Sequence, residues 1–392
     1  MQMQFKYLTM LTQISEWFNI PIFALEIINP NPITARGICK IPGYIRDSYT
    51  VKKFDSIDGL ARKCGVRPEA ILLLNQMEQE ILREGETIEI PWQVKSSIVN
   101  PHFGYDHSRV EQDIQTLYEM YSMFQVRVIG ESEQGRSITE ITIGNGPLHV
   151  HLNASFHGNE WVTTNVVMQF VQDYVHAIAT GGHLYGIPAE TLYTECTLSV
   201  VPMVNPDGVE IAQYGPHDEE RPVYRSMLLH EGVTFQDWKA NARGVDLNNQ
   251  FPTNWEIEKN RKWAKIPAYR DYPGAAPLTE KEAIVMQKLV EEKQFHRVVA
   301  LHTQGKEFYW GYEGIEPKES ALLAARFERA SGYKAVQMID SHAGFKDWFI
   351  ATYEKPGFTI ELGEGVNPLP IEQFESIYRD VIGILVEAIR PL

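Results

Sequence analysis

The chain has 392 residues and a formal net charge of −15, with 44% hydrophobic and 22% charged residues. This composition indicates a folded globular protein of more than one domain, because single cores rarely grow beyond about 250–300 residues. The negative charge argues against nucleic-acid binding, which needs a basic surface, and against electrostatic docking on anionic lipid. We expect no membrane span, because no apolar stretch reaches the roughly 18 residues that one requires.

The N-terminus and the cysteines indicate neither a signal peptide nor a disulfide framework. Residues 1–28 superficially resemble a signal peptide, but charged and polar residues interrupt the apolar run and no small-residue cleavage site follows. We therefore expect no signal peptide. The widely spaced cysteines form no C-x-x-C pair, so we expect reduced thiols at Cys39, Cys64 and Cys196.

Two segments near the N-terminus repeat each other. Residues 14–29 align with residues 60–75, and the alignment brings Asn29 opposite Asn75. Each copy then passes a glycine and reaches a short strand that ends in Ile-Pro. Recurrence of so small a unit indicates a modular binder.

The second copy predicts a strand, two helices and a strand. Residues 49–52 form the first strand, and Asp55 or Ser56 can cap a helix. A second helix starts at Pro68, where the missing N–H costs nothing, and residues 87–90 form the last strand.

This βααβ pattern resembles the LysM module. The resemblance covers residues 48–92 and, in degenerate form, residues 1–44. It implies binding to N-acetylglucosamine-containing glycans such as peptidoglycan; the alternative is a pair of spacers. Residues 93–100 are polar and predict a linker, and residues 101–392 then form the catalytic domain.

Strands alternate with helices in this second domain, which indicates an α/β fold. An H-x-x-E step, His157 to Glu160, follows the apolar run 148–154, and two further apolar runs end at His302 and Glu361. Ligands bind beyond the carboxyl ends of strands in open α/β sheets, so three strand ends would bring these side chains together. Two imidazoles and one carboxylate form a catalytic zinc site with a fourth position open for water.

Three other patterns receive simpler interpretations. A second H-x-x-E step, His217 to Glu220, lies in an acidic run and is interpreted as a solvated loop. Residues 205–208, Asn-Pro-Asp-Gly, carry a turn signature, with Asp207 as a turn residue. Thr279 and Glu282 predict a capping box at a helix start.

Five ordered motifs resemble those of the zinc metallocarboxypeptidase family: His157-Gly-Asn-Glu160, Asn205-Pro-Asp-Gly208, Ala242-Arg-Gly-Val-Asp-Leu-Asn248, Leu301-His302 and Thr359-Ile-Glu361-Leu. The resemblance implies a mixed eight-stranded sheet flanked by helices. It further implies one zinc ion held by His157, Glu160 and His302, with zinc-bound water as the nucleophile and Glu361 as the general base.

The chain departs from the family at the substrate-binding positions. Peptide-tail-cleaving members carry an Arg after the residue that matches Asn248, where this chain has Asn249, and a neutral amide cannot form the charge-assisted fork with a carboxylate. The oxyanion-stabilising Arg corresponds to Lys239. The active-site Tyr aligns near Ile339, and His342 is a candidate substitute or a surface loop histidine.

These departures resemble one bacterial branch of the family, the γ-D-glutamyl-meso-diaminopimelate peptidases. The resemblance implies cleavage of the bond between γ-D-glutamate and a diamino acid, diaminopimelate or lysine, in cell-wall stem peptides. Arg243 is then a candidate to bind the D-glutamate α-carboxylate, with a structural ion pair as the alternative. Asp246 is expected to support the site from behind or to form a turn.

Two alternative functions stay open on the sequence: a carboxypeptidase that trims ordinary C-termini, and a non-catalytic peptidoglycan-binding protein. The sequence does not choose between endo- and exo-action or between sporulation, recycling and lysis. With no export signal visible, we expect a cytoplasmic, spore or mother-cell compartment for a protein that acts on the cell wall.

Overall fold

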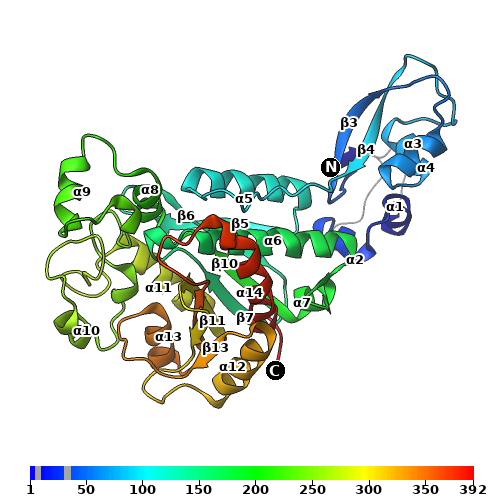
Figure 1. Ribbon diagram of the computed structural model, residues 1–392. Coiled ribbons are helices and arrows are strands. Elements are labelled where there is room, and N and C mark those ends of the chain that lie inside the picture. Colours follow the sequence, from blue (N-terminus) through cyan, green and yellow to red (C-terminus); the bar gives the residue numbers. More distant parts are fainter. Residues whose placement is uncertain (5–9, 31–36) are drawn as a thin grey trace. The chain divides into compact units, whose positions relative to one another are not determined.

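The computed structural model describes residues 1–4, 10–30 and 37–392 (Figure 1). The chain divides into two compact units. The first comprises Met1–Ile98, Asp113–Phe124 and Gln172–Thr191, and the second comprises the remaining residues. Within the described ranges, none of the helices combines the length and the apolar character needed to cross a bilayer.

The first βααβ arrangement lies at the N-terminus. Its elements are β1 (Gln2–Gln4), α1 (Leu11–Phe18), α2 (Ile22–Ile28) and β2 (Ile38–Lys40). β1 and β2 pair antiparallel. The parts of this module at residues 5–9 and 31–36 lie outside the described residues. The order of elements is the one that the internal repeat predicts.

The second arrangement consists of β3 (Tyr44–Thr50), α3 (Ile57–Cys64), α4 (Pro68–Leu74) and β4 (Thr87–Gln93). Ser56 is the cap of α3, since its Oγ accepts from the Gly59 N–H at 3.1 Å. Asp55 instead accepts from the Tyr49 hydroxyl at 2.9 Å and from the Lys52 N–H at 2.7 Å. β3 starts before the expected strand because its antiparallel pairing with β4 extends back to Tyr44.

An asparagine at the equivalent position closes each copy of the repeat. Asn75 Nδ2 donates to the Glu89 carbonyl at 2.7 Å, and the Glu89 N–H donates back to Asn75 Oδ1 at 2.7 Å. Asn29 makes the matching pair of bonds with Lys40, at 3.0 and 2.9 Å. Each asparagine therefore clamps the end of its second helix to the last strand, which confirms the register of the repeat.

The segment 93–100, expected to be a linker, is bonded at its far end. β4 runs to Gln93. Gln172 of α6 (Val162–Thr180) accepts from the Ile98 N–H at 2.6 Å and donates to Ser97 Oγ at 2.6 Å. Direct hydrogen bonds thus hold this part of the connection to a helix.

Eight strands form the large sheet that positions the site (Figure 1). They are β5 (Phe124–Glu131), β6 (Ser137–Ile143), β7 (Leu148–Asn153), β10 (Cys196–Val201), β11 (Arg297–Thr303), β12 (Glu307–Tyr309), β13 (Lys334–Val336) and β14 (Gly357–Leu362). Their order is β13-β12-β14-β11-β7-β10-β6-β5. The four central strands are parallel, whereas β6 and β12 run antiparallel to their inner neighbours. The expected mixed eight-stranded sheet is confirmed.

Helices cover both faces of this sheet. The remaining helices are α5 (His107–Tyr121), α7 (Ala189–Glu195), α8 (Pro206–Tyr214), α9 (Arg221–Leu228), α10 (Trp255–Arg261), α11 (Lys281–Lys293), α12 (Lys318–Ser331), α13 (Phe345–Tyr353) and α14 (Phe374–Ala388). Met286 of α11 and Phe345 of α13 share one buried cluster with Val298 of β11. Val299 is also buried, and because side chains alternate along a strand it belongs to the opposite, equally covered face.

The interpretation of residues 205–208 as a turn is wrong. Asn205 caps α8 through its Oδ1, which accepts from the Gly208 N–H at 2.9 Å, and Pro206 is the first helical residue. Asn followed by Pro satisfies a helix start as well as a turn. Asp207 is a buried ion-pair residue, since its carboxylate lies 2.6 Å from Arg136 Nη1.

The expected capping box at the start of α11 is also wrong. The N-cap is Glu280, which makes no side-chain cap bond. The Thr279 hydroxyl instead donates to Gln250 Oε1 at 3.1 Å. Glu282 turns into the interior and accepts from the Glu133 N–H at 3.1 Å, and burial raises its pKa to about 8.

A buried histidine lies on β7 inside the sheet. His151 Nδ1 is 3.1 Å from Ser199 Oγ, and the ring stacks on Phe295 with centroids 4.9 Å apart. Its Nε2 has no partner among the described residues. Burial lowers the pKa of His151 to about 3, because a desolvated imidazolium is disfavoured.

We predict that His151 makes the fold acid-sensitive. The folded pKa lies below the unfolded value near 6.5, so the contribution of the neutral ring is complete above that pH and is lost as pH falls toward 3. His151→Phe keeps the stacking and removes the titration. Between pH 7 and pH 4 the unmodified chain should lose about 3 kcal/mol of unfolding free energy more than the variant.

Urea unfolding at several pH values measures this difference. His217→Ala, at an exposed histidine, is the control and should follow the unmodified chain. Parallel pH dependences for the unmodified chain and His151→Phe would contradict the prediction.

Candidate active site

The carboxyl ends of three neighbouring strands meet at one edge of the large sheet. β14, β11 and β7 are adjacent in this order. His302 and Glu361 are register partners in the parallel β11–β14 pair. His157 and Glu160 follow β7, and Glu160 lies in the short 3₁₀ helix η1 (Gly158–Glu160). The side chains that the apolar runs predicted to converge therefore come from adjacent strand ends.

Four donor atoms from His157, Glu160 and His302 face one another. His157 Nδ1 is 2.8 Å from Glu160 Oε1, His302 Nδ1 is 3.0 Å from Glu160 Oε2, and the two Nδ1 atoms are 3.2 Å apart. Ligands at about 2.0–2.1 Å around a tetrahedral zinc ion lie about 3.3 Å from each other. The donor set and its spacing therefore fit zinc.

The electrostatics of this cluster favour a carboxylate between positive neighbours. Burial acts to raise the pKa of Glu160, but the charges of His157 and Lys239 outweigh it and hold that pKa well below the usual range. For His157 burial acts to lower the pKa, and the Glu160 carboxylate more than offsets this effect. Burial lowers the pKa of His302, which leaves its ring neutral and able to bind a metal.

Asp246 contacts the ring nitrogen of His157 that faces away from the donor cluster. Its Oδ1 lies 3.3 Å from His157 Nε2 and accepts from the Asn248 N–H at 3.2 Å, while Oδ2 accepts from the Asp271 N–H at 3.3 Å. A carboxylate on the far ring nitrogen fixes the tautomer in which the near nitrogen can bind a metal. The structure thus places Asp246 behind His157 and not within the donor set.

The loop that carries His157 is braced by close backbone contacts. The Gly158 N–H donates to the Lys239 carbonyl at 3.1 Å. A Cβ on Gly158 would lie only 2.3 Å from the Gly208 carbonyl oxygen, so a larger residue could not fit without moving the backbone. Asn205 Nδ2 adds a bond to the Phe156 carbonyl at 3.1 Å. The Asn-Pro-Asp-Gly segment therefore supports the loop that carries His157.

A pocket of about 380 Å³ opens beside the cluster. We call it the site pocket and define it by six of its lining residues: Asn159, Lys239, Arg270, Tyr309, Glu361 and Asn367. Burial and the nearby Glu160 charge raise the pKa of Glu361 to about 8. A bound cation would oppose this shift, because positive charge favours the carboxylate. The pocket combines carboxyl groups, cations and neutral hydrogen-bonding groups.

Of the residues expected to bind substrate or assist catalysis, Lys239 lines the site pocket, with its Nζ 3.4 Å from Glu160 Oε1. Arg243 lies outside the lining, and its Nη1 is 3.6 Å from Glu280 Oε1, as in the structural ion-pair alternative. His342 is also outside; it is buried, with Nδ1 2.9 Å from the Tyr312 hydroxyl, so a surface histidine is the wrong interpretation.

The two asparagines lie close to the site without lining the pocket. Asn248 Oδ1 accepts from the Phe345 N–H at 3.0 Å, which ties η3 (Leu247–Asn249) to α13. Asn249 is buried, and its N–H donates to the Asp246 carbonyl at 3.0 Å.

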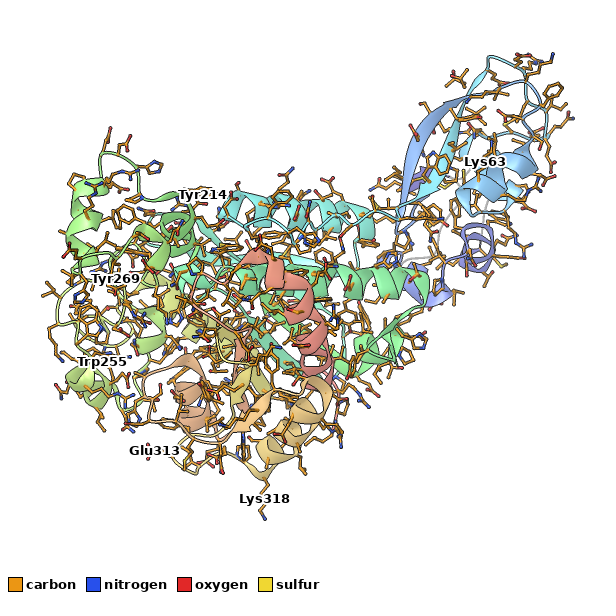
Figure 2. All side chains as sticks on the ribbon, in the orientation of Figure 1. Lys63, Tyr214, Trp255, Tyr269, Glu313 and Lys318 are labelled. Carbon is orange, nitrogen blue, oxygen red and sulfur yellow. The ribbon has the colours of Figure 1, made fainter. Side chains whose placement is uncertain are left out.

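Among the six residues that define the site pocket, three were not found from the sequence: Arg270, Tyr309 and Asn367. Arg270 follows Tyr269, another lining residue, which Figure 2 labels within the second unit. An arginine inside an aromatic stretch of an acidic chain is a signal that the sequence offered. Tyr309 reaches the site through the pairing of β12 with β14, which is a long-range contact without a local signal. Asn367 Nδ2 lies 3.4 Å from Glu160 Oε1, also across a large sequence separation.

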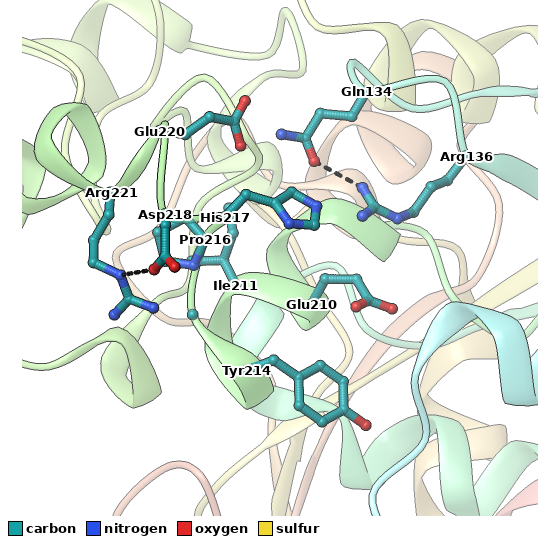
Figure 3. A pocket seen from close by; sticks show the side chains of 11 residues that line it. Gln134, Arg136, Glu210, Ile211, Tyr214, Pro216, His217, Asp218, Glu220 and Arg221 are labelled. Carbon is teal, nitrogen blue, oxygen red and sulfur yellow. Dashed lines mark hydrogen bonds and ion pairs between the residues drawn. The ribbon is translucent and has the colours of Figure 1, made fainter.

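The second H-x-x-E step forms no comparable cluster. His217 and Glu220 belong to a surface loop beside a separate pocket of about 290 Å³ (Figure 3), in which His217 is exposed and Glu220 half-buried. The drawn interactions there join Gln134 to Arg136 and Asp218 to Arg221, and none joins His217 to Glu220. Neither residue belongs to a potential metal-binding group of the described ranges. The interpretation as a solvated loop is confirmed.

Family models match two parts of this chain. A model of zinc carboxypeptidases matches residues 110–382, and a LysM model matches residues 49–91. The chain belongs to the zinc carboxypeptidase family. It is 42% identical to gamma-D-glutamyl-L-diamino acid endopeptidase 1 of Lysinibacillus sphaericus, over 95% of each chain. It is also 41% identical to an uncharacterised protein of Bacillus subtilis (strain 168), over 89% of this chain and 88% of the relative.

Solved structures agree on the fold. A carboxypeptidase A from Helicoverpa armigera has a TM-score of 0.57 at 16% identity, and the match covers 89% of this chain and 97% of the other. At this identity the likeness shows the carboxypeptidase-like fold alone.

We predict that Asp246 strengthens metal binding without being a ligand. Asp246→Asn keeps the shape and removes the charge that holds His157 Nε2, so zinc affinity should fall by about 10–100-fold. Competition with a chromophoric chelator measures the dissociation constant. Asp218→Asn, at an exposed aspartate of the other pocket, should leave the affinity unchanged. An unchanged affinity in Asp246→Asn would contradict the prediction.

Proposed function

We propose that this protein is a zinc-dependent peptidoglycan hydrolase that cleaves the bond between γ-D-glutamate and the diamino acid of cell-wall stem peptides. The observation that carries the proposal is the 42% identity to an enzyme named for this activity. That match extends over 95% of both chains and so includes the LysM-like and the carboxypeptidase-like parts.

We further propose that His157, Glu160 and His302 hold one zinc ion. The converging donor atoms and their spacing support this assignment. When bound, zinc lowers the pKa of a coordinated water to about 7 and polarises the scissile carbonyl. Glu361 takes up a proton from the nucleophile and donates it to the leaving amine, as a buried carboxyl group of the site pocket can do.

Lys239 also takes part in the proposed reaction. Its ammonium group lies in the site pocket beside Glu160 and stabilises the negative charge that develops on the carbonyl oxygen. Its position is fixed at the backbone, because the Lys239 N–H donates to the Tyr269 carbonyl at 2.9 Å. A lysine supplies a point charge without the planar fork of an arginine.

The neutral Asn249 supports the choice of substrate. An ordinary carboxypeptidase needs a cation to bind the terminal carboxylate, and an amide cannot replace it. The LysM match at residues 49–91 supports glycan binding by residues 48–92. We assign the same role to the degenerate module at residues 1–44, whose asparagine clamp repeats that of the second module. Peptidoglycan contains both the glycan and the stem peptide.

We predict that the activity requires Glu361 and the metal site. Purified chain should cleave L-Ala-γ-D-Glu-diaminopimelate between the last two residues, and a chelator should abolish the reaction. Glu361→Gln should lower kcat by about 10²–10⁴-fold, because general acid–base catalysis contributes that much. Mass spectrometry of the digest identifies the products.

The two H-x-x-E steps provide a matched control for this experiment. His157→Ala should lose zinc and activity, whereas His217→Ala should retain both. Release of single C-terminal residues from ordinary peptides would favour the carboxypeptidase alternative. The non-catalytic alternative would be favoured by a different pair of results. Zinc-loaded protein would leave the stem peptide uncleaved, and the same protein would still sediment with peptidoglycan.

A further inference from the structure

The site pocket contains one arginine among its described lining residues, Arg270. It follows Tyr269 in the segment that also supports Lys239 through the backbone. The remaining ionisable groups of the lining include the cation Lys239 and the carboxyl groups of Asp237 and Glu361. Arg270 is therefore the pocket's source of a planar, permanently charged hydrogen-bonding group.

The inner end of the Arg270 guanidinium is firmly held. Its Nε donates to Asp271 Oδ2 at 2.9 Å, and the same oxygen accepts from Trp263 Nε1 at 2.8 Å. The Asp271 N–H in turn donates to Asp246 Oδ2 at 3.3 Å. The carboxylate that supports His157 therefore also fixes the segment that carries Arg270.

The outer end of the guanidinium is free. Within the described ranges, neither terminal nitrogen of Arg270 has a hydrogen-bond partner, and the side chain is 41% exposed. Two parallel N–H groups of an arginine match the two oxygens of a carboxylate. The guanidinium of Arg270 is held at Nε, and its two terminal nitrogens have no hydrogen-bond partner within the described ranges. This arrangement suits substrate binding, because little side-chain freedom is lost when the substrate binds.

We infer that Arg270 binds the α-carboxylate of the D-glutamyl residue, on the acyl side of the scissile amide. The inference rests on the proposed function and deepens it. A γ-linked D-glutamyl residue keeps a free α-carboxylate, which Cα and two methylene groups separate from the scissile carbonyl. An acyl residue linked through its α-carboxyl group has used that group in the peptide bond. Binding this group requires no free chain end, so it suits endo-action. The diamino acid carries the other nearby carboxylate.

The test compares Arg270→Gln with the unmodified full-length chain on three tripeptides. The first is L-Ala-γ-D-Glu-diaminopimelate, the second has the D-glutamate α-carboxylate amidated, and the third has the diamino acid carboxylates amidated. With the first and third, Arg270→Gln should lower kcat/KM by about 10–100-fold, mainly through KM, since one charge-assisted fork is lost. With the second, variant and unmodified chain should agree within about twofold.

Control variants separate substrate binding from a structural effect. Arg270→Lys restores the charge without the fork and should recover part of the loss. Arg379→Gln changes an exposed arginine of α14 and should match the unmodified chain on every substrate. Zinc content should be equal in all variants. A loss in Arg270→Gln that disappears only on the third peptide would assign the diamino acid carboxylate instead.

Two further results would overturn the inference while leaving the proposed function intact. The first is an unmodified chain that cleaves the first peptide and an Arg270→Gln variant with the same KM. The second is an equal loss on all three peptides, which would make Arg270 structural. An unmodified chain that cleaves none of the three peptides would instead overturn the proposed function, and the inference with it.

Discussion

The buried carboxylate of Asp246 links the parts of the site that come from different regions of the chain. It contacts the ring of His157 and the backbone N–H groups of Asn248 and Asp271. An unpaired buried charge is costly, so these partners must be in place together for the carboxylate to remain ionised. The loop that carries His157, the Asn248–Asn249 segment and the segment of Arg270 are thereby fixed relative to one another.

The second constraint is the register of the sheet. Because His302 and Glu361 are cross-strand partners, a shift of β14 by one residue would turn Glu361 to the opposite face. The buried apolar residues of β11 and β14 prevent such a shift. The geometry of the donor set therefore depends on core packing well away from the polar atoms.

The sequence predicted the parts of the site that follow a local rule. Apolar runs that end in His or Glu located His302 and Glu361, and strand-then-helix context separated His157 from His217. The prediction was wrong where one sequence pattern is typical of two local structures. Asn followed by Pro fits both a turn and a helix start, and Asn205-Pro206 begins a helix. Thr279 was misassigned because the tertiary contact with Gln250 replaces a cap. Tyr309 enters the pocket through the long-range pairing of β12 with β14, for which no local pattern exists. Arg270 lies in an aromatic stretch, a local signal that the sequence analysis did not use.

The hydrogen bonds of Asn29 and Asn75 in the repeats join residues that are much closer in sequence than the residues of the site. Asn29 and Asn75 bond to strands 11 and 14 residues away, whereas His302 meets Glu160 and His157 across 142 and 145 residues. Loop-closure entropy and contact order both favour the short closures. During synthesis from the N-terminus the modules can therefore close while the strands that complete the donor set are still absent. A nascent chain of this protein would complete its two βααβ modules before its donor set.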